Sequence, residues 1–241
     1  MKHLSVLFAS FVVCCVGSTA FAEKSAHSAE QSLEFKRTAG YVEPLSSADA
    51  KRGESKAATC AACHGTEGKS VVPSFPKLAG QGPKYIYKQL QNMKSIDGEE
   101  PLRPVPQMAG ILPTLSDQDM ADLALYFSQQ KTTLEGVDPE WVERGKSLYL
   151  SGDAKTGVPA CVSCHGPEGR GVDSAGYPAL SGQHVAYIEA ELRAFRAAGR
   201  GDIDAPDYRI NDGESMMMRQ SAKNLSDQDI RALANYISGL Y

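Results

Sequence analysis

Cys60-Ala61-Ala62-Cys63-His64 is the stretch that decides the fold, and it recurs as Cys161-Val162-Ser163-Cys164-His165. A C-x-x-C-H run is typical of a c-type haem attachment site. If the run opens a helix, residues three and four apart share one face. Both cysteines can then bond vinyl carbons at one porphyrin edge, while the histidine ligates the iron. The sequence therefore predicts two covalently bound haem c groups, attached through Cys60, Cys63, Cys161 and Cys164, with His64 and His165 as iron ligands.

Two other functions of a C-x-x-C pair compete with haem attachment, namely a redox dithiol and half of a zinc site. A structural zinc site takes four protein ligands, whereas each run offers three. No cysteine remains elsewhere beyond the first fifteen residues. With six Cys and five His in 241 residues, two accidental C-x-x-C-H runs are a negligible explanation. These observations favour haem attachment.

The N-terminus has the pattern of a secretory signal peptide. A short basic region precedes an apolar run, Leu4–Val16, and Ala20-Phe21-Ala22 is a cleavage signal, so we expect residues 1–22 to be removed. The run has about thirteen residues, fewer than the ~20 that span a bilayer. A lipoprotein signal is disfavoured because Val13 precedes Cys14, where a small residue would be expected. Export predicts a periplasmic location.

The charge balance excludes one class of partner. Cleavage after Ala22 leaves 24 basic and 29 acidic residues, a net charge of −5, and haem propionates would add negative charge. Nucleic acid is therefore not an expected partner. No other apolar segment approaches membrane length, so we expect a soluble protein and leave a peripheral position at the membrane open. Residues 23–47 are rich in Ser, Ala, Glu and Lys, which predicts a flexible tail, with His27 as a solvated residue of it.

From Ala48 onward the chain repeats itself. Residues 75–81 match 177–183 at an offset of 102, and residues 115–119 match 225–229 at an offset of 110. The two haem runs are offset by 101. The repeat predicts two domains, 48–130 and 139–241, joined by a linker at 131–138. The second copy carries about eight extra residues before its last helix.

Neither copy shows a convincing alternating strand, so the predicted fold class is all-α. Ser116 and Ser226 each begin an S-x-x-D box, which marks the start of a final helix. Gly53 and Gly145 lie inside the first helix of each copy. Because Gly costs about 1 kcal/mol relative to Ala in a helix, we expect close helix packing there. The other expected helices are 49–58, 83–95, 139–150 and 184–198.

A methionine is the expected second iron ligand, because His and Met together raise the reduction potential as electron carriers require. The repeat aligns Met108 with Met218, each eight residues before the serine of its S-x-x-D box. Both are expected in loops, and both are predicted ligands. Other methionines align with residues that cannot ligate: Met93 with Phe195, Met120 with Ile230, Met216 with Pro106, and Met217 with Gln107.

One histidine stays open as an alternative iron ligand. His184 aligns with Gly82, so the repeat offers it no counterpart in the first copy. A ligand that serves both haems in the same way should appear in both copies. The alignment therefore favours the methionines.

With these residues placed, the chain resembles the di-haem cytochrome c4 family over residues 48–241. The resemblance is carried by the two C-x-x-C-H runs, residues 75–81, the two Leu-Ser-Asp-Gln-Asp segments and residues 236–240. It implies two tandem class I cytochrome c domains, each a small helical fold around one covalent haem with His and Met ligands, and haems close together near the domain interface. The tail at 23–47 departs from the family and leaves a tether or docking role open.

The resemblance implies a periplasmic electron carrier between respiratory chain components, with a terminal oxidase among the acceptors. The expected partners are redox proteins: an oxidase, a cytochrome complex or a dehydrogenase. Two alternatives remain: a cytochrome subunit of a dehydrogenase complex, and a di-haem peroxidase-type or thiosulfate-oxidising enzyme. An enzyme needs an iron that opens or a different ligand, and the symmetric His/Met pattern argues against that. The prediction is a protein that is not an enzyme.

Overall fold

The computed structural model describes residues 42–95, 98–202, 204, 205 and 207–241. Their regular structure is helical, with isolated bridges that pair Asp153 with Val158 and Val172 with Tyr177. The all-α prediction is confirmed. None of the helices in these ranges is long and apolar enough to cross a membrane. The predicted signal peptide, His27 and the tail up to residue 41 lie outside the described residues.

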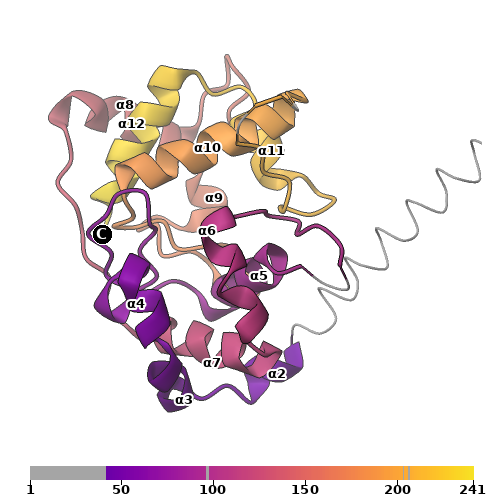
Figure 1. Ribbon diagram of the computed structural model, residues 1–241. Coiled ribbons are helices and arrows are strands. Elements are labelled where there is room, and N and C mark those ends of the chain that lie inside the picture. The colour runs from indigo at the N-terminus through magenta and orange to yellow at the C-terminus, as the bar shows by residue number, and fades with distance from the viewer. Residues whose placement is uncertain (1–41, 96–97, 203, 206) are drawn as a thin grey trace, which may run out of the picture. The chain divides into compact units, whose positions relative to one another are not determined.

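The helices follow the predicted repeat (Figure 1). The first half holds α2 (Val42–Ser46), α3 (Ala50–Lys56), α4 (Ala58–His64), η1 (Thr66–Gly68), α5 (Pro83–Met93), α6 (Pro106–Ala109), η2 (Leu112–Thr114) and α7 (Asp117–Ser128). The second half holds α8 (Pro139–Ser151), α9 (Val162–His165), η3 (Asp173–Ala175), α10 (Val185–Arg200), α11 (Met217–Ala222) and α12 (Asp227–Ser238). Of the extra residues in the second copy, some lengthen α10, which has 16 residues where α5 has 11.

The first half begins earlier than expected. The predicted flexible tail extended to Ser47, but its last residues form α2 instead. Leu45 packs against the core of the first half, and the Gln118 side chain of α7 donates to the Pro44 carbonyl at 3.2 Å. Apolar burial and this bond hold α2 on α7, which a composition rich in polar residues did not indicate.

The final helix of each half starts at the predicted capping box. In α7 the Ser116 hydroxyl accepts from the Asp119 backbone at 3.1 Å, and the Asp119 carboxylate accepts from the Ser116 backbone at 3.0 Å. Ser226 and Asp229 repeat both bonds in α12, each at 3.1 Å. Each box satisfies two backbone donors that the helix itself leaves free.

Two glycines let α3 touch α7 and α8 touch α12, which is the close helix packing predicted at these positions. A Cβ added at Gly53 would lie 2.1 Å from the Asp122 carbonyl oxygen of α7. A Cβ added at Gly145 would lie 2.2 Å from the Ala232 carbonyl oxygen of α12. Any side chain at either position would collide with backbone, so α3 crosses α7, and α8 crosses α12, at a glycine.

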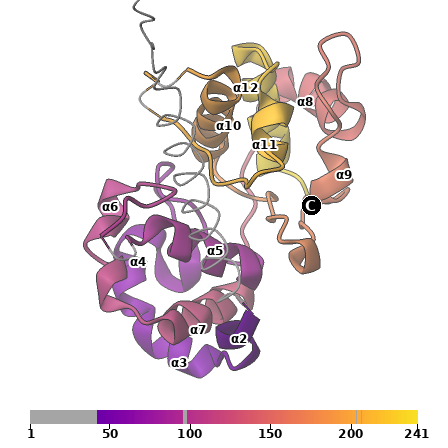
Figure 2. The ribbon, with the colours of Figure 1, turned by 90° about the vertical axis from the view of Figure 1, so that its right-hand side faces the viewer.

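Each half has its own apolar core. Met120, Leu123 and Phe127 of α7 are buried with Ile86 of α5 in the first half. In the second half α10 lies beside α11 and α12 (Figure 2), and the corresponding buried residues are Ile188, Phe195, Ile230, Leu233 and Ile237. Met120 and Ile230 are both fully buried, which confirms that pair as core positions.

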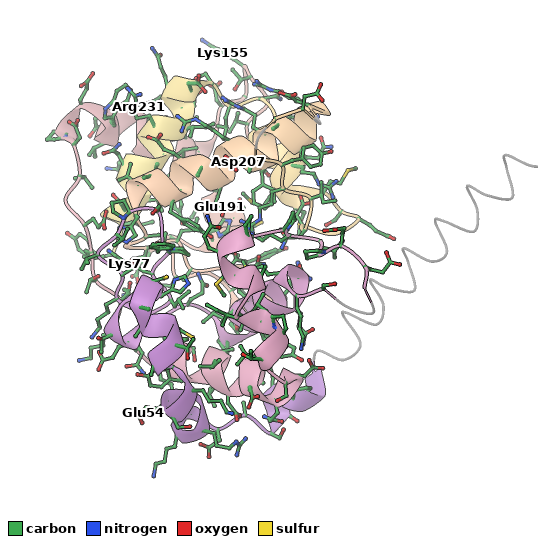
Figure 3. The ribbon with its side chains drawn as sticks, in the orientation of Figure 1. Glu54, Lys77, Lys155, Glu191, Asp207 and Arg231 are labelled. Atoms are coloured by element: carbon green, nitrogen blue, oxygen red, sulfur yellow. The ribbon has the colours of Figure 1, made fainter. Side chains whose placement is uncertain are left out.

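The two halves are joined by hydrogen bonds as well as by the chain. The side-chain amide of Gln183 bonds both backbone groups of Lys77, and the side-chain amide of Gln81 bonds both backbone groups of Ala179. The Lys77 ammonium also donates to the Gly182 carbonyl at 2.8 Å; Figure 3 labels Lys77. Loops that directly follow the haem runs therefore meet each other.

Candidate haem sites

The C-x-x-C-H runs lie on helices, as expected. The first run falls within α4, which ends at His64 and is followed by Gly65 with φ of 75°. The second begins at Cys161, which has helical φ and ψ of −66° and −30°, and continues through α9 to Gly166 with φ of 76°. This positive φ is readily adopted by glycine, so the chain can turn away immediately after each histidine. The cysteines and the histidine of each run share one helix face.

Each histidine is oriented by a proline carbonyl. The His64 Nδ1 lies 2.8 Å from the Pro76 oxygen, and the His165 Nδ1 lies 2.9 Å from the Pro178 oxygen. Burial lowers the pKa of both imidazoles, so the neutral form is favoured. Because a carbonyl only accepts, Nδ1 carries the proton and Nε2 keeps its lone pair. A neutral imidazole with Nε2 free suits an iron ligand.

The cysteines do not resemble a redox dithiol. All four are half-buried, and Cys60 and Cys161 pack against the apolar cores of their halves. Burial raises the pKa of Cys60, and it raises the pKa of Cys161 to about 11. Catalytic dithiols need a lowered pKa, because the thiolate is the nucleophile. Apolar surroundings and helical spacing fit thioether attachment to an apolar macrocycle.

The predicted methionine ligands lie on short helices and not in loops. Met108 is half-buried on α6, which has Pro106 at its first turn. Met218 is half-buried on α11 and packs against the same core cluster as Cys161. Helices of four and six residues are too short to show a periodic pattern, which explains why loops were expected.

The two neighbours of Met218 have different surroundings. Met216 precedes α11 with a left-handed φ of 48° and is 40% exposed. Met217 is 43% exposed, and its sulfur lies 3.6 Å from the Tyr177 hydroxyl. Of the three adjacent methionines, Met218 is the one packed against the core that also contacts Cys161.

His184 is buried in the second half near the linker. Its Nδ1 contacts the Glu135 carboxylate, and its Nε2 is a buried polar atom with no hydrogen-bond partner among the described residues. Glu135 also lies 3.1 Å from the Lys77 ammonium. The His184 ring is therefore held by Glu135, in the segment between the halves. The equivalent position of the first half is Gly82, so this contact has no counterpart there.

A buried polar network, which sequence reasoning missed, connects α5 and α10. The Arg103 guanidinium donates to Gln89 at 2.8 Å and to the Tyr187 hydroxyl at 3.0 Å. The Arg209 guanidinium donates to Gln89 at 3.0 Å, and both arginines contact the Glu191 carboxylate, labelled in Figure 3. Gln89 and Glu191 occupy equivalent positions of the repeat. Because the first half has a neutral amide there, the two arginine cations share the single carboxylate of Glu191.

The electrostatics of this network keep Glu191 ionised. Burial raises the pKa of Glu191, but the Arg209 and Arg103 guanidinium groups outweigh it and hold the pKa below its usual value. Two cations and one anion leave the network with one net positive charge, buried between α5 and α10. The sequence signal is weak: one arginine follows α5 and another follows α10. Their offset matches neither of the neighbouring repeat offsets.

Comparison with known proteins identifies the family. The cytochrome c family model matches residues 50–131 and 142–240. The chain is 47% identical to cytochrome c4 of Azotobacter vinelandii, over 80% of this chain and 90% of that one. It is 33% identical to a thiosulfate dehydrogenase electron acceptor of Stutzerimonas stutzeri, over 76% and 80%. The crystal structure of reduced recombinant cytochrome c4 from Pseudomonas stutzeri matches with a TM-score of 0.73 at 45% identity, covering 80% of this chain and 100% of that one.

These matches agree with the geometry. Both family-model segments contain one C-x-x-C-H helix and one carbonyl-oriented histidine. The matches span 80 to 100% of the relatives' own lengths, so they extend over both halves. The chain belongs to the cytochrome c family and, within it, to the cytochromes c4: it is a di-haem electron-transfer protein with one covalently bound haem c in each half.

Proposed function

We propose that the first haem is bound through Cys60 and Cys63 with His64 and Met108 on its iron, and the second through Cys161 and Cys164 with His165 and Met218. The observation that carries this proposal is the matched pair of histidines, each buried with Nδ1 on a proline carbonyl and Nε2 left as the ligating atom. Bound haem supplies a one-electron couple between ferrous and ferric iron.

The methionine assignment rests on position and packing. Met108 and Met218 are equivalent in the repeat, and both sit half-buried on the helix that precedes the final helix of their half. A thioether is a soft, weak donor that stabilises ferrous iron and raises the potential. Met218 has the stronger support, because it shares an apolar cluster with Cys161.

The function that these ligands support is electron carriage without bond making at the metal. An iron with His and Met both bound has no vacant position for a substrate. The protein then determines the reduction potential of each haem, the access of other molecules to it and the docking of redox partners. A relative named as an electron acceptor of thiosulfate dehydrogenase supports a carrier that receives electrons from another enzyme. A dehydrogenase, a cytochrome complex or an oxidase fits as redox partner.

An export signal at residues 1–22 would place this exchange in the periplasm, and that location is part of the proposal. The mature chain would carry a net charge of −5 before its haems are counted, which suits docking on a partner surface with complementary positive regions. Transient redox complexes use small interfaces, so transfer rates with the partner should fall as ionic strength rises.

A carbon monoxide challenge separates a carrier from an enzyme. The fully reduced di-haem protein is mixed with carbon monoxide near neutral pH, and the Soret band is followed. We expect slow binding or none at both haems, because a bound methionine must leave first. Rapid, complete binding at either haem would contradict the carrier proposal and favour an enzyme with an open iron.

A further inference from the structure

Gln183 reaches from the second half to the backbone of a single residue, Lys77, of the first. Its Oε1 accepts from the Lys77 backbone N–H at 2.9 Å, and its Nε2 donates to the Lys77 carbonyl at 2.9 Å. Oε1 also accepts from the His184 backbone at 3.1 Å. Gln183 is 9% exposed, so its amide is buried.

Gln81 does the same in the opposite direction. Its Oε1 accepts from the Ala179 backbone N–H at 2.8 Å, and its Nε2 donates to the Ala179 carbonyl at 2.8 Å. Oε1 also accepts from the Gly82 backbone at 2.9 Å. Gln81 and Gln183 are equivalent in the repeat, and so are Lys77 and Ala179. The two glutamines therefore make equivalent pairs of hydrogen bonds, in opposite directions between the halves.

The peptide that each glutamine binds is the one that orients a histidine. The Lys77 N–H and the Pro76 carbonyl belong to one planar peptide group. Gln183 holds the N–H end of that plane, and His64 donates to its carbonyl end at 2.8 Å. A hydrogen bond at the N–H polarises the carbonyl and makes it a better acceptor. The same relay runs from Gln81 through the peptide of Pro178 and Ala179 to His165.

We propose that Gln81 and Gln183 are crossed positioning residues: each fixes, from its own half, the peptide group that orients the iron-ligating histidine of the other half. The inference rests on His64 and His165 being ligands, as proposed above. Hydrogen bonding at Nδ1 sets the ring orientation and raises the basicity of the ligating nitrogen. Each half thus acts on the ligand of the other half through a single peptide group.

The test compares Gln183→Leu with Gln81→Leu in the intact di-haem protein. Nuclear magnetic resonance of each haem, assigned through contacts with residues of its own half, reports ligation and the exchange of the histidine Nδ1 proton. Wild-type protein must first show both histidine rings ligated, which tests the proposed function separately. Ala variants at the same positions serve if a Leu variant does not fold.

Gln183→Leu should speed exchange of the His64 Nδ1 proton about tenfold, since both hydrogen bonds that hold the Lys77 backbone, one of them on the peptide group that orients His64, are lost. It should shift the first haem to a higher potential while the second keeps its signals. Gln81→Leu should do the reverse. The control is Asn211→Ala, which loses bonds across the halves to Gln89 and Asn92 but touches neither loop, and it should leave both exchange rates unchanged. Effects confined to the variant's own half, equal effects on both haems, or no effect would overturn the proposal.

Discussion

The two halves share their ligand geometry and differ in what surrounds it. His64 and His165 meet their proline carbonyls within 0.1 Å of the same distance, at 2.8 and 2.9 Å. In the surroundings, Gln89 of the first half occupies the repeat position of Glu191 in the second, and Asp122 of the first, only 1% exposed, occupies the repeat position of Ala232. Duplicated attachment chemistry is thus combined with unequal electrostatics, which is a way for one fold to give two haems different potentials.

The glycine crossings test whether the halves pack equivalently, and they should give the largest effect. Gly53→Ala and Gly145→Ala each force a Cβ into a backbone carbonyl at 2.1 or 2.2 Å. We expect each to lower the free energy of unfolding by about 3 kcal/mol, as severe overpacking does. Denaturant titration measures this loss.

Gly110→Ala is the matched control for the glycine crossings. Gly110 has φ of −79° and no atom within 4 Å of an added Cβ, so its replacement should leave stability nearly unchanged. A loss at one crossing without a loss at the other would show that the halves do not pack alike.

The Gln89 and Glu191 pair tests the electrostatic difference. Glu191 lies on α10, in the half that holds the second haem. Glu191→Gln should raise the potential of the second haem more than that of the first, by an amount on the order of 1 kcal/mol for one charge at an effective dielectric constant of ~20. Spectroelectrochemical titration measures both potentials.

Gln89→Glu is the mirror experiment. The Gln89 oxygen already accepts from Arg103, Arg209 and Asn211, so a carboxylate at this position would accept hydrogen bonds from the same donors. This variant should lower the potential of the first haem more than that of the second. If both variants shifted the same haem, the network would not distinguish the halves.

Acid should expose a smaller difference between the two final helices. The hydrogen bond from Lys56, followed by the Ser116 backbone bond, lowers the pKa of Asp119 to about 2 from 3.8. Because the folded pKa is lowered, the stabilisation is present above pH 3.8 and is lost as the pH falls toward 2. Asp119→Asn should therefore flatten the pH dependence of unfolding in that window. Asp229→Asn is the comparison in the second half, where Arg144 replaces Lys56 as the ion-pair partner; an unchanged slope for Asp119→Asn would contradict the assignment.

Local patterns in the sequence predicted the features that depend on neighbouring residues. The C-x-x-C-H helices, the Ser116 and Ser226 capping boxes and the crossings at Gly53 and Gly145 each depend on a spacing within one segment, repeated in two copies. Repetition also aligned Met108 with Met218, an assignment that stays a prediction.

Features that depend on contacts between the halves could not be read in the same way. Gln81 and Gln183 were visible as repeated residues, but their crossed bonds to Ala179 and Lys77 depend on how two loops meet. The network of Arg103, Arg209 and Glu191 has no period and no local signature. Very short helices such as α6 and α11 fall below the length at which periodicity is detectable.

The most direct test of the account is the near-infrared sulfur-to-iron band in single methionine variants. Met218→Leu should abolish this band for the second haem and lower that haem's potential, while the first haem keeps its band. Met108→Leu should do the same for the first haem, and Met216→Leu and Met217→Leu should keep both bands. If Met218→Leu kept both bands while Met216→Leu or Met217→Leu lost one, the equivalence of Met108 and Met218 would be wrong, and with it the claim that the two halves bind their irons alike.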